Sequence, residues 1–257
     1  MVLHPVVTEG FQKSPDDYEF GRPGYNKDVV DYLSQVFHLA NGSQIVDLAT
    51  GTGKFARAIA SSGAQVIGID PVEGMRGKFR ELLPSLEIVG GIAEALPLAD
   101  SSVDLITVAQ AFHWFEGDSA IQEIHRVLRK GGGLALVYNV RDSTIPWVGK
   151  VNKLVDQYEF EGTIPRHKSG KWKAAFERTT NLFTPLEEAQ FHSVQRGNEE
   201  LIIKRFTSVS YIAALPERKK MEFENKVRTI LHTDPGTAGM EVIELPYRVD
   251  VYWCIKI

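Results

Sequence analysis

The segment Ile45-Val46-Asp47-Leu48-Ala49-Thr50-Gly51-Thr52-Gly53-Lys54-Phe55-Ala56 decides the fold, because an apolar run ends at an acid, passes through small residues and enters an amphipathic stretch. That order predicts a strand, a tight loop and a helix. Glycines at 51 and 53 allow positive φ and let a ligand approach where a Cβ would collide. The segment therefore predicts a loop that holds a nucleotide-type cofactor.

A second, mostly apolar run follows the predicted helix and supplies an acid. Gln65–Ile69 is expected to form the neighbouring strand, and it ends at Asp70. An acid about twenty residues after such a loop, at the tip of the adjacent strand, accepts hydrogen bonds from ribose hydroxyls. Loop and acid together predict a cofactor that contains adenosine.

Two cofactor classes fit this arrangement. The spacing Gly51-x-Gly53-x-x-Ala56 satisfies the dinucleotide pattern, in which a pyrophosphate lies at the helix N-terminus. Asp47 shifts the balance, because a carboxylate at the end of the first strand repels a pyrophosphate but suits the ammonium of a methionine moiety. We favour S-adenosylmethionine and keep a nicotinamide dinucleotide as the alternative.

Further landmarks follow in order along nearly the whole chain. They are Gly68-Ile69-Asp70-Pro71 with Met75, Gly91–Pro97, Val103–Phe115 and Glu123–Gly133. Together with Val46–Gly53, this series resembles class I S-adenosylmethionine-dependent methyltransferases, specifically the small-molecule branch that includes trans-aconitate methyltransferase and the ubiquinone/menaquinone biosynthesis enzymes. The chain departs from the family pattern at Ala49, where the family usually carries glycine, and this slightly narrows the loop.

The residues and the resemblance together assign a candidate site. Asp47 is expected to face the amino-acid part of the cofactor, and Asp70 is expected to hold its ribose. The resemblance implies that Ala93 and Glu94 flank the adenine and that His113 lies near the methyl group, where it is the candidate catalytic base. The predicted cofactor-binding set is Tyr18, Arg22, Asp47, Ala49, Gly51, Gly53, Asp70, Pro71, Met75, Ala93, Glu94, Gln110 and Ala111. No metal ligands are expected.

An N-terminal block, Tyr18–Tyr25, also resembles the family, in which such a segment closes over the cofactor. Arg22 would pair with the cofactor carboxylate, and the ring of Tyr18 would shield the sulfonium. Structural alternatives remain open for several residues. Arg22 and Tyr18 would equally fasten the arm to the sheet, Asp70 would cap the next helix, and His113 would pack in the core.

The fold class follows from apolar runs and helical patterns that alternate over residues 27–139. We predict an α/β, Rossmann-like, seven-stranded and mostly parallel sheet with helices on both faces, an antiparallel last strand and a helical cap insertion. A helix is expected at Ser119–Leu128, started by a capping box and ended by Gly131-Gly132-Gly133, before a strand at Leu134–Tyr138. The chain is expected to be one domain, residues 1–257. Its expected parts are a cofactor-covering segment (1–26), a cofactor-binding core (27–139), a cap insertion (140–189) and C-terminal strands and helices (190–257).

Composition limits the partners and the location. The net charge of −4 and the pI near 6.0 give no broad attraction to nucleic acid or anionic membrane. Cys254 is the single cysteine, so neither a disulfide framework nor a cysteine-based zinc site is expected. Residues 1–10 lack the features of a signal peptide, and no run is long and apolar enough to span a bilayer. We predict a cytoplasmic enzyme without membrane insertion, and the sequence leaves the oligomeric state open.

The predicted reaction is methyl transfer to a small-molecule acceptor, namely a carboxylate, hydroxyl or carbon nucleophile. Such an in-line displacement gains mostly from alignment and from exclusion of water, so a dedicated base is optional. Methylation of RNA or protein is an alternative, disfavoured by the net acidity and by the absence of an appended basic domain. A nicotinamide-dependent oxidoreductase is a further alternative.

Overall fold

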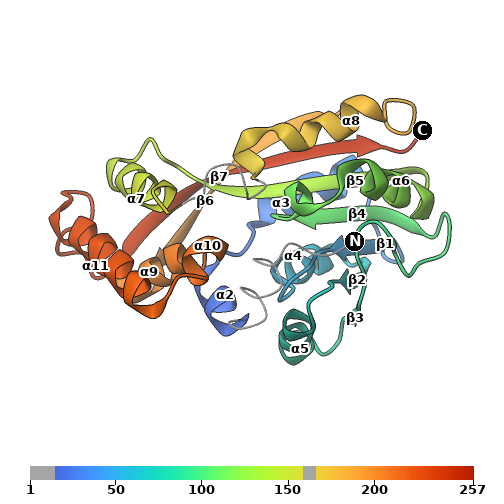
Figure 1. Cartoon of the computed structure of the whole chain (residues 1–257). Coiled ribbons are helices and arrows are strands. Elements are labelled where there is room, and N and C mark those ends of the chain that lie inside the picture. The colour runs from blue at the N-terminus through green and yellow to red at the C-terminus, as the bar shows by residue number, and fades with distance from the viewer. Residues whose placement is uncertain (1–14, 159–165) are drawn as a thin grey trace. The chain divides into compact units, whose positions relative to one another are not determined.

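The computed structural model describes residues 15–158 and 166–257 (Figure 1). The first fourteen residues of the predicted cofactor-covering segment, and residues 159–165 of the predicted cap, lie outside the described residues. The chain divides into two compact units. Unit 1 combines the described parts of Met1–Pro23, Asn139–Ile164 and His192–Arg248, and unit 2 combines Gly24–Tyr138, Pro165–Phe191 and Val249–Ile257.

A seven-stranded sheet has the strand order β3-β2-β1-β4-β5-β7-β6. Its strands are β1 (Gln44–Leu48), β2 (Gln65–Ile69), β3 (Glu87–Val89), β4 (Val103–Ala109), β5 (Leu128–Arg141), β6 (Glu187–Gly197) and β7 (Ile243–Ile255). Strands β1 to β5 pair in parallel. Strand β7 runs opposite to β5, because the Lys256 N–H donates to the Gly132 carbonyl at 2.8 Å while the Gly131 N–H donates to the Lys256 carbonyl at 3.1 Å. The predicted fold class is confirmed.

Helices connect the strands and supply the buried faces. In the described residues they are α2 (Pro15–Gly21), α3 (Lys27–Val36), α4 (Lys54–Ile59), α5 (Glu73–Leu82), α6 (Gly117–Val127), α7 (Pro146–Asp156), α8 (Ala174–Arg178), α9 (Glu199–Thr207), α10 (Ser210–Ala213) and α11 (Glu217–Thr233). Among these residues, no helix is both long enough and apolar enough to cross a bilayer.

The core of unit 2 forms where the helices meet the parallel strands. Helices α3, α4 and α5 contribute Leu33, Phe55 and Phe79, and these pack against strand residues such as Ile45 and Leu105. All five side chains are buried. Because side chains alternate along a strand, Asp47 and Thr107 continue the same face of β1 and β4 one step toward the carboxyl ends. The packed face therefore leads directly to the candidate site.

Unit 1 has a separate apolar core. It is built by α7, α9, α10 and α11 together with the first half of β7. Trp147 of α7 packs edge-on against Phe206 of α9, with ring centroids 6.4 Å apart. In unit 2, Trp172 and Phe176 pack against Phe112. Trp147, Trp172 and Phe176, which belong to the predicted cap, therefore pack into apolar cores.

The structure differs from the prediction around α6. The helix begins at Gly117, and the Glu116 carboxylate, not Ser119, caps it by accepting the Ser119 N–H at 3.2 Å. The helix ends at Val127, before the three glycines, which lie inside β5. Gly133 is needed there because a Cβ would overlap the Phe37 ring. Gly133 therefore serves strand packing, and none of the three glycines ends the helix.

Candidate functional site

The loop between β1 and α4 is held in left-handed backbone conformations. Ala49, Gly51 and Gly53 have φ values of 54°, 58° and 85°. The Thr50 N–H donates to the Ile69 carbonyl at 3.1 Å, which ties the loop to the end of β2. A strand, a tight loop with positive φ and a helix are therefore present as the sequence predicts, at the carboxyl edge where open α/β sheets bind ligands.

Asp47 is fully buried at the carboxyl end of β1. Its carboxylate accepts hydrogen bonds from the hydroxyls of Thr50 at 2.5 Å and Thr107 at 2.9 Å. Thr107 is the residue paired with Asp47 across the β1–β4 register. Burial raises the pKa of Asp47 to about 6, against the opposing effect of these hydrogen bonds. The two threonines thus fix the carboxylate, a role for which the sequence carries no local signal.

Asp70 links the ends of β2 and the loop. Its Oδ2 accepts the Gly51 N–H at 2.9 Å, and its Oδ1 accepts the Val72 N–H at 2.8 Å. The second bond forms a turn before α5, so the structural alternative for Asp70 is present together with a bond to the glycine loop. Burial raises the pKa of Asp70 to about 6, while Arg76 opposes this shift. Each carboxylate oxygen retains a second lone pair that can accept a ligand hydroxyl.

Gly53 has a packing role in addition to its backbone conformation. A Cβ at this position would overlap Cδ1 of Leu83 and would lie 2.6 Å from Cδ2 of Phe79. Helix α5 therefore packs directly against the start of α4, and the same Phe79 ring restricts Gly68 in β2 at 3.0 Å. Close packing between the loop and α5 accounts for the glycine at 53 even without a ligand.

Ala49 is strained where the family pattern has glycine. Its φ of 54° is a left-handed conformation that costs a non-glycine residue about 1 to 2 kcal/mol. Glycine loses about 0.5 to 1 kcal/mol more backbone entropy than alanine. We therefore expect Ala49→Gly to raise the free energy of unfolding by up to about 1 kcal/mol, measured by urea denaturation. Ala56→Gly, inside α4, is the control and is expected to destabilise by about 1 kcal/mol. Equal losses in both variants would contradict the strain.

The segment predicted to flank adenine follows β3. Ala93 is buried, and the Glu94 carboxylate accepts the Glu116 N–H at 2.8 Å. Met75 of α5 is buried, and Pro71 is partly buried beside Asp70. These residues lie beyond the carboxyl ends of β2 and β3, next to the loop that carries Asp70.

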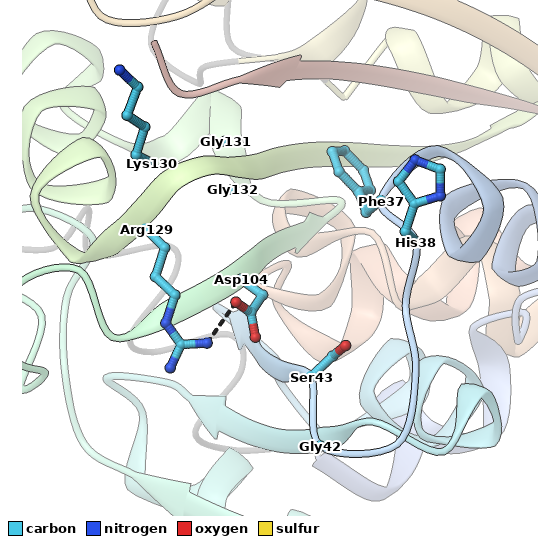
Figure 2. A pocket seen from close by; sticks show the side chains of 9 residues that line it. All are labelled: Phe37, His38, Gly42, Ser43, Asp104, Arg129, Lys130, Gly131 and Gly132. Carbon is cyan, nitrogen blue, oxygen red and sulfur yellow. Dashed lines mark hydrogen bonds and ion pairs between the residues drawn. The ribbon is translucent and has the colours of Figure 1, made fainter.

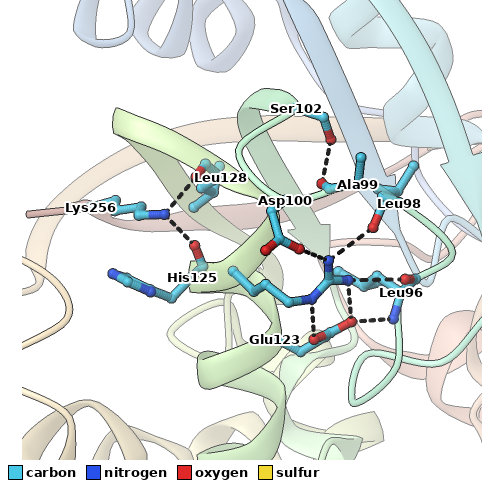
Figure 3. Close-up of polar contacts among 10 residues, drawn as sticks. Leu96, Leu98, Ala99, Asp100, Ser102, Glu123, His125, Leu128 and Lys256 are labelled. Carbon is cyan, nitrogen blue, oxygen red and sulfur yellow. Dashed lines mark hydrogen bonds and ion pairs between the residues drawn. The ribbon is translucent and has the colours of Figure 1, made fainter.

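Arg126 of α6 holds this segment in place (Figure 3). Its guanidinium donates to the carbonyls of Leu96 at 3.2 Å and Leu98 at 3.0 Å, and it pairs with the carboxylates of Asp100 and Glu123. Glu123 in turn accepts the Leu96 N–H at 2.8 Å. Arg126 lies within the family landmark Glu123–Gly133, but its function has no local signal, because the carbonyls it contacts are 28 and 30 positions away.

Arg126→Met should loosen the segment that carries Ala93 and Glu94. The substitution removes the donors to two carbonyls and leaves Glu123 without its cation, and each lost charge-assisted bond is worth about 1.5 to 3 kcal/mol at most. We expect the free energy of unfolding to fall by roughly 1 to 2 kcal/mol and the affinity for S-adenosylhomocysteine to fall by about fivefold. Calorimetry measures the affinity. Arg129→Met is the control, because Arg129 pairs with Asp104 instead. Equal affinities in the two variants would count against this positioning role.

The end of β4 carries a second strained residue. Gln110 has a φ of 64°, and its N–H donates to the Val137 carbonyl of β5 at 2.9 Å. Ala111 follows, and then a short 3-10 helix, η2 (Phe112–Trp114), presents His113. The His113 ring lies 5.3 Å from the Trp114 ring and 5.9 Å from the Tyr138 ring, centroid to centroid. Ala49 and Gln110 place positive-φ residues at this edge, while two further non-glycine residues of the described part of the chain with positive φ, His38 and Ser101, precede β1 and β4.

Two residues of the predicted cofactor-binding set, Tyr18 and Arg22, belong to unit 1. Arg22 Nη2 donates to the Ser208 carbonyl at 2.7 Å, and its guanidinium lies 5.2 Å from the Tyr18 ring centroid. Arg22 thus fastens the N-terminal arm to the end of α9. Their predicted contacts with the cofactor stay predictions.

A polar cavity of about 420 Å³ lies at the amino ends of the strands (Figure 2). Its lining residues are Phe37, His38, Gly42, Ser43, Asp104, Arg129, Lys130, Gly131 and Gly132. Ser43 directly precedes β1, and Arg129 pairs with Asp104 at 2.6 Å near the start of β4. Because parallel α/β sheets bind ligands at their carboxyl ends, this cavity is not the cofactor site.

The sheet order and the loop after β1 define a Rossmann-like α/β fold. The family model described as "Methyltransferase domain" matches residues 46–136. An uncharacterized methyltransferase-like protein of Schizosaccharomyces pombe is 35% identical over 239 residues, which cover 93% of this chain and 92% of the relative. The chain therefore belongs to the class I S-adenosylmethionine-dependent methyltransferases.

Solved structures agree on the fold. A putative methyltransferase from an antibiotic biosynthesis pathway of Anabaena variabilis has a TM-score of 0.65 at 20% identity, covering 90% of this chain and 98% of its own. A phosphoethanolamine N-methyltransferase of Haemonchus contortus, in complex with S-adenosyl-L-methionine, has a TM-score of 0.56 at 15% identity, covering 95% of this chain and 57% of its own. At these identities the two structures show the fold of the chain, and use of S-adenosylmethionine is implied by the family.

Proposed function

We propose that this chain binds S-adenosylmethionine at the carboxyl edge of β1, β2 and β4 and transfers its methyl group to a small-molecule acceptor. The observation that carries the proposal is the bond between the Asp70 carboxylate and the Gly51 N–H, which fixes a ribose acceptor beside the glycine loop. When bound, S-adenosylmethionine supplies an electrophilic methyl group on a sulfonium.

The residues of the site fit this donor. The Asp70 carboxylate has lone pairs left for two ribose hydroxyls, and the Asp47 carboxylate is the anion suited to an ammonium. Ala93 and Glu94 are the proposed adenine contacts. The remaining proposed contacts are Ala49, Gly51, Gly53, Pro71, Met75, Gln110 and Ala111.

Methyl transfer needs few catalytic groups around the acceptor. In-line methyl transfer depends on alignment and on the exclusion of water. Beside His113, the rings of Phe112, Phe115 and Phe176 pack together and are proposed to exclude water from the acceptor. His113 is proposed to contact the acceptor and to take its proton where the nucleophile is not already ionised. The net charge of −4 favours a small acceptor over RNA.

Calorimetry with three ligands tests the proposal. S-adenosylmethionine and S-adenosylhomocysteine are expected to bind with micromolar Kd, about −8 kcal/mol. NAD is expected to show no binding, because Asp47 would repel its pyrophosphate. Binding of NAD alone would replace the methyltransferase proposal with the oxidoreductase alternative.

The affinity for S-adenosylhomocysteine should depend on pH through Asp47 and Asp70. Burial raises both pKa values from 3.8 to about 6. The folded chain therefore binds more protons than the unfolded chain between about pH 4 and 6, so these two groups contribute less stability as the pH rises through that window. Ligand binding needs the ionised forms. We thus expect the affinity to fall by at least about tenfold per pH unit below pH 6.

Calorimetry at pH 7.5, 6.0 and 5.0 measures this dependence. Thermal unfolding of the free chain at the same pH values is the control, because it shows whether the chain stays folded at pH 5.0. An affinity that does not change across this range would show that neither carboxylate has to be ionised for binding.

A further inference from the structure

A cluster of arginines lies in unit 1, with Arg205 buried and Arg141 partly exposed. Arg205 of α9 is only 4% exposed. Its Nε donates to the Tyr247 hydroxyl at 2.8 Å, and that hydroxyl donates to Oε1 of Gln195 at 3.0 Å. Among the described residues, Nη1 of Arg205 is buried and has no hydrogen-bond acceptor. A charged, buried N–H group is therefore left for something else to bind.

Arg141, at the end of β5, belongs to the same cluster. Its Nε donates to Oδ1 of Asn152 at 2.6 Å, and its guanidinium lies 4.9 Å from the Phe206 ring centroid. Burial, together with the charges of Arg205 and Arg22, lowers the pKa of Arg141 to about 9. The positive charges of Arg141, Arg205 and Arg22 therefore lie close together, with little water to screen them.

Neither Arg141 nor Arg205 has an ion pair within the described part of the chain. By contrast, four more exposed arginines each form an ion pair with a carboxylate: Arg178, Arg196, Arg218 and Arg228. The groups that oppose the lowered pKa of Arg141 are two tyrosines, Tyr247 and Tyr211, which are neutral at pH 7. The cluster therefore lacks the counter-charge that buried arginines normally have.

Leaving a buried charge unpaired is costly, so such a group is normally paired or hydrogen-bonded. The planar guanidinium fork matches the oxygens of a carboxylate or phosphate. We infer that Arg141 and Arg205 form a binding site for the oxyanion group of a small molecule, a carboxylate or a phosphate. The neutral hydroxyl of Tyr247 and the Phe206 ring surround the site without competing for its charge.

The inference is tested on the full chain with malonate and inorganic phosphate as probes. Malonamide is the neutral analogue of malonate, and sodium chloride at matched ionic strength controls for screening. Thermal unfolding reports binding, because a ligand of the folded state raises Tm. A rise of about 3 °C is expected when malonate or phosphate is present at roughly ten times its Kd, with none for malonamide.

Variants locate the effect. Arg205→Met and Arg141→Met should each abolish the rise, while Arg218→Met should keep it, because Arg218 lies on α11 with its side chain 91% exposed. If Arg205→Met does not fold, Arg205→Lys replaces it as the test. This variant keeps the charge but loses the planar guanidinium fork, so it should reduce the rise in Tm at least by half. A rise that is absent in the wild type, or that persists in both methionine variants, would overturn the inference.

The source of the oxyanion is separated by calorimetry with S-adenosylhomocysteine, which carries its own carboxylate. If the arginines bind the cofactor, Arg205→Met should weaken this affinity tenfold or more. If they bind another molecule, the affinity should be unchanged while the malonate response is lost. A wild-type chain that binds S-adenosylhomocysteine but gives no anion response keeps the proposed function and rejects the arginine site.

Discussion

Replacing Asp70 by alanine is expected to weaken the binding of S-adenosylhomocysteine by about tenfold to a hundredfold. The change removes the proposed ribose acceptor and also the acceptor of the Gly51 and Val72 N–H groups. Hydrogen bonds to a charged group are worth about 1.5 to 3 kcal/mol each, which sets this range. Calorimetry at pH 7.5, where the carboxylate is ionised, measures the change.

Two further variants separate ligand contact from loop support. Asp70→Asn retains one carbonyl oxygen, but its amide NH₂ is only a donor, so one of the two backbone N–H groups loses its acceptor and most of the same affinity should be lost. Asp104→Ala is the matched control at the opposite edge of the sheet, because Asp104 also accepts a backbone N–H, from Gln44 at 2.8 Å, and pairs with Arg129. Full affinity in Asp70→Ala would remove Asp70 from the site.

Gly53→Ala is expected to lower the free energy of unfolding by about 2 to 5 kcal/mol. The left-handed φ of 85° costs about 1 to 2 kcal/mol for alanine. Displacing the Phe79 ring and Leu83 from the new Cβ adds about 1 to 3 kcal/mol of overpacking. Urea denaturation measures the loss, and the binding of S-adenosylhomocysteine should weaken with it.

A glycine in the neighbouring helix provides the contrast. Gly77 lies inside α5, and a Cβ added there would meet no atom within 4 Å, so Gly77→Ala should raise the free energy of unfolding by about 0.5 to 1 kcal/mol. If both alanine variants change stability by the same sign and amount, close packing at Gly53 is not the constraint.

The sequence predicts the parallel half of this protein well, because its signals are local. The run from Ile45 to Ala56 contains strand, loop and helix in order, and the positions of Gly51 and Gly53 match their positive φ. The position of Asp70 beside the glycine loop is predicted from its place at the end of the adjacent strand. Periodicity and turn chemistry within a dozen residues are sufficient for these features.

The features missed depend on contacts between distant residues. Thr107 supports Asp47 because the strands β1 and β4 align them across 60 positions. Arg205 has no acceptor for Nη1 because α9 packs it beside Tyr247, and periodicity alone marks it as a surface residue of an amphipathic helix. The sequence predicts that the three glycines after α6 end the helix, because nothing local shows that Phe37 packs over Gly133.

Lys256 donates to the carbonyls of His125 and Leu128 at 2.7 and 2.8 Å, and so closes the C-terminal end of α6 from a strand made much later on the ribosome. His125 and Leu128 precede Lys256 by 131 and 128 positions. At roughly 5 to 20 residues per second, translation supplies the lysine about 7 to 26 s after the helix. During that interval the carbonyls of His125 and Leu128 lack this donor, so the C-terminal end of α6 is completed only when the chain is almost fully made.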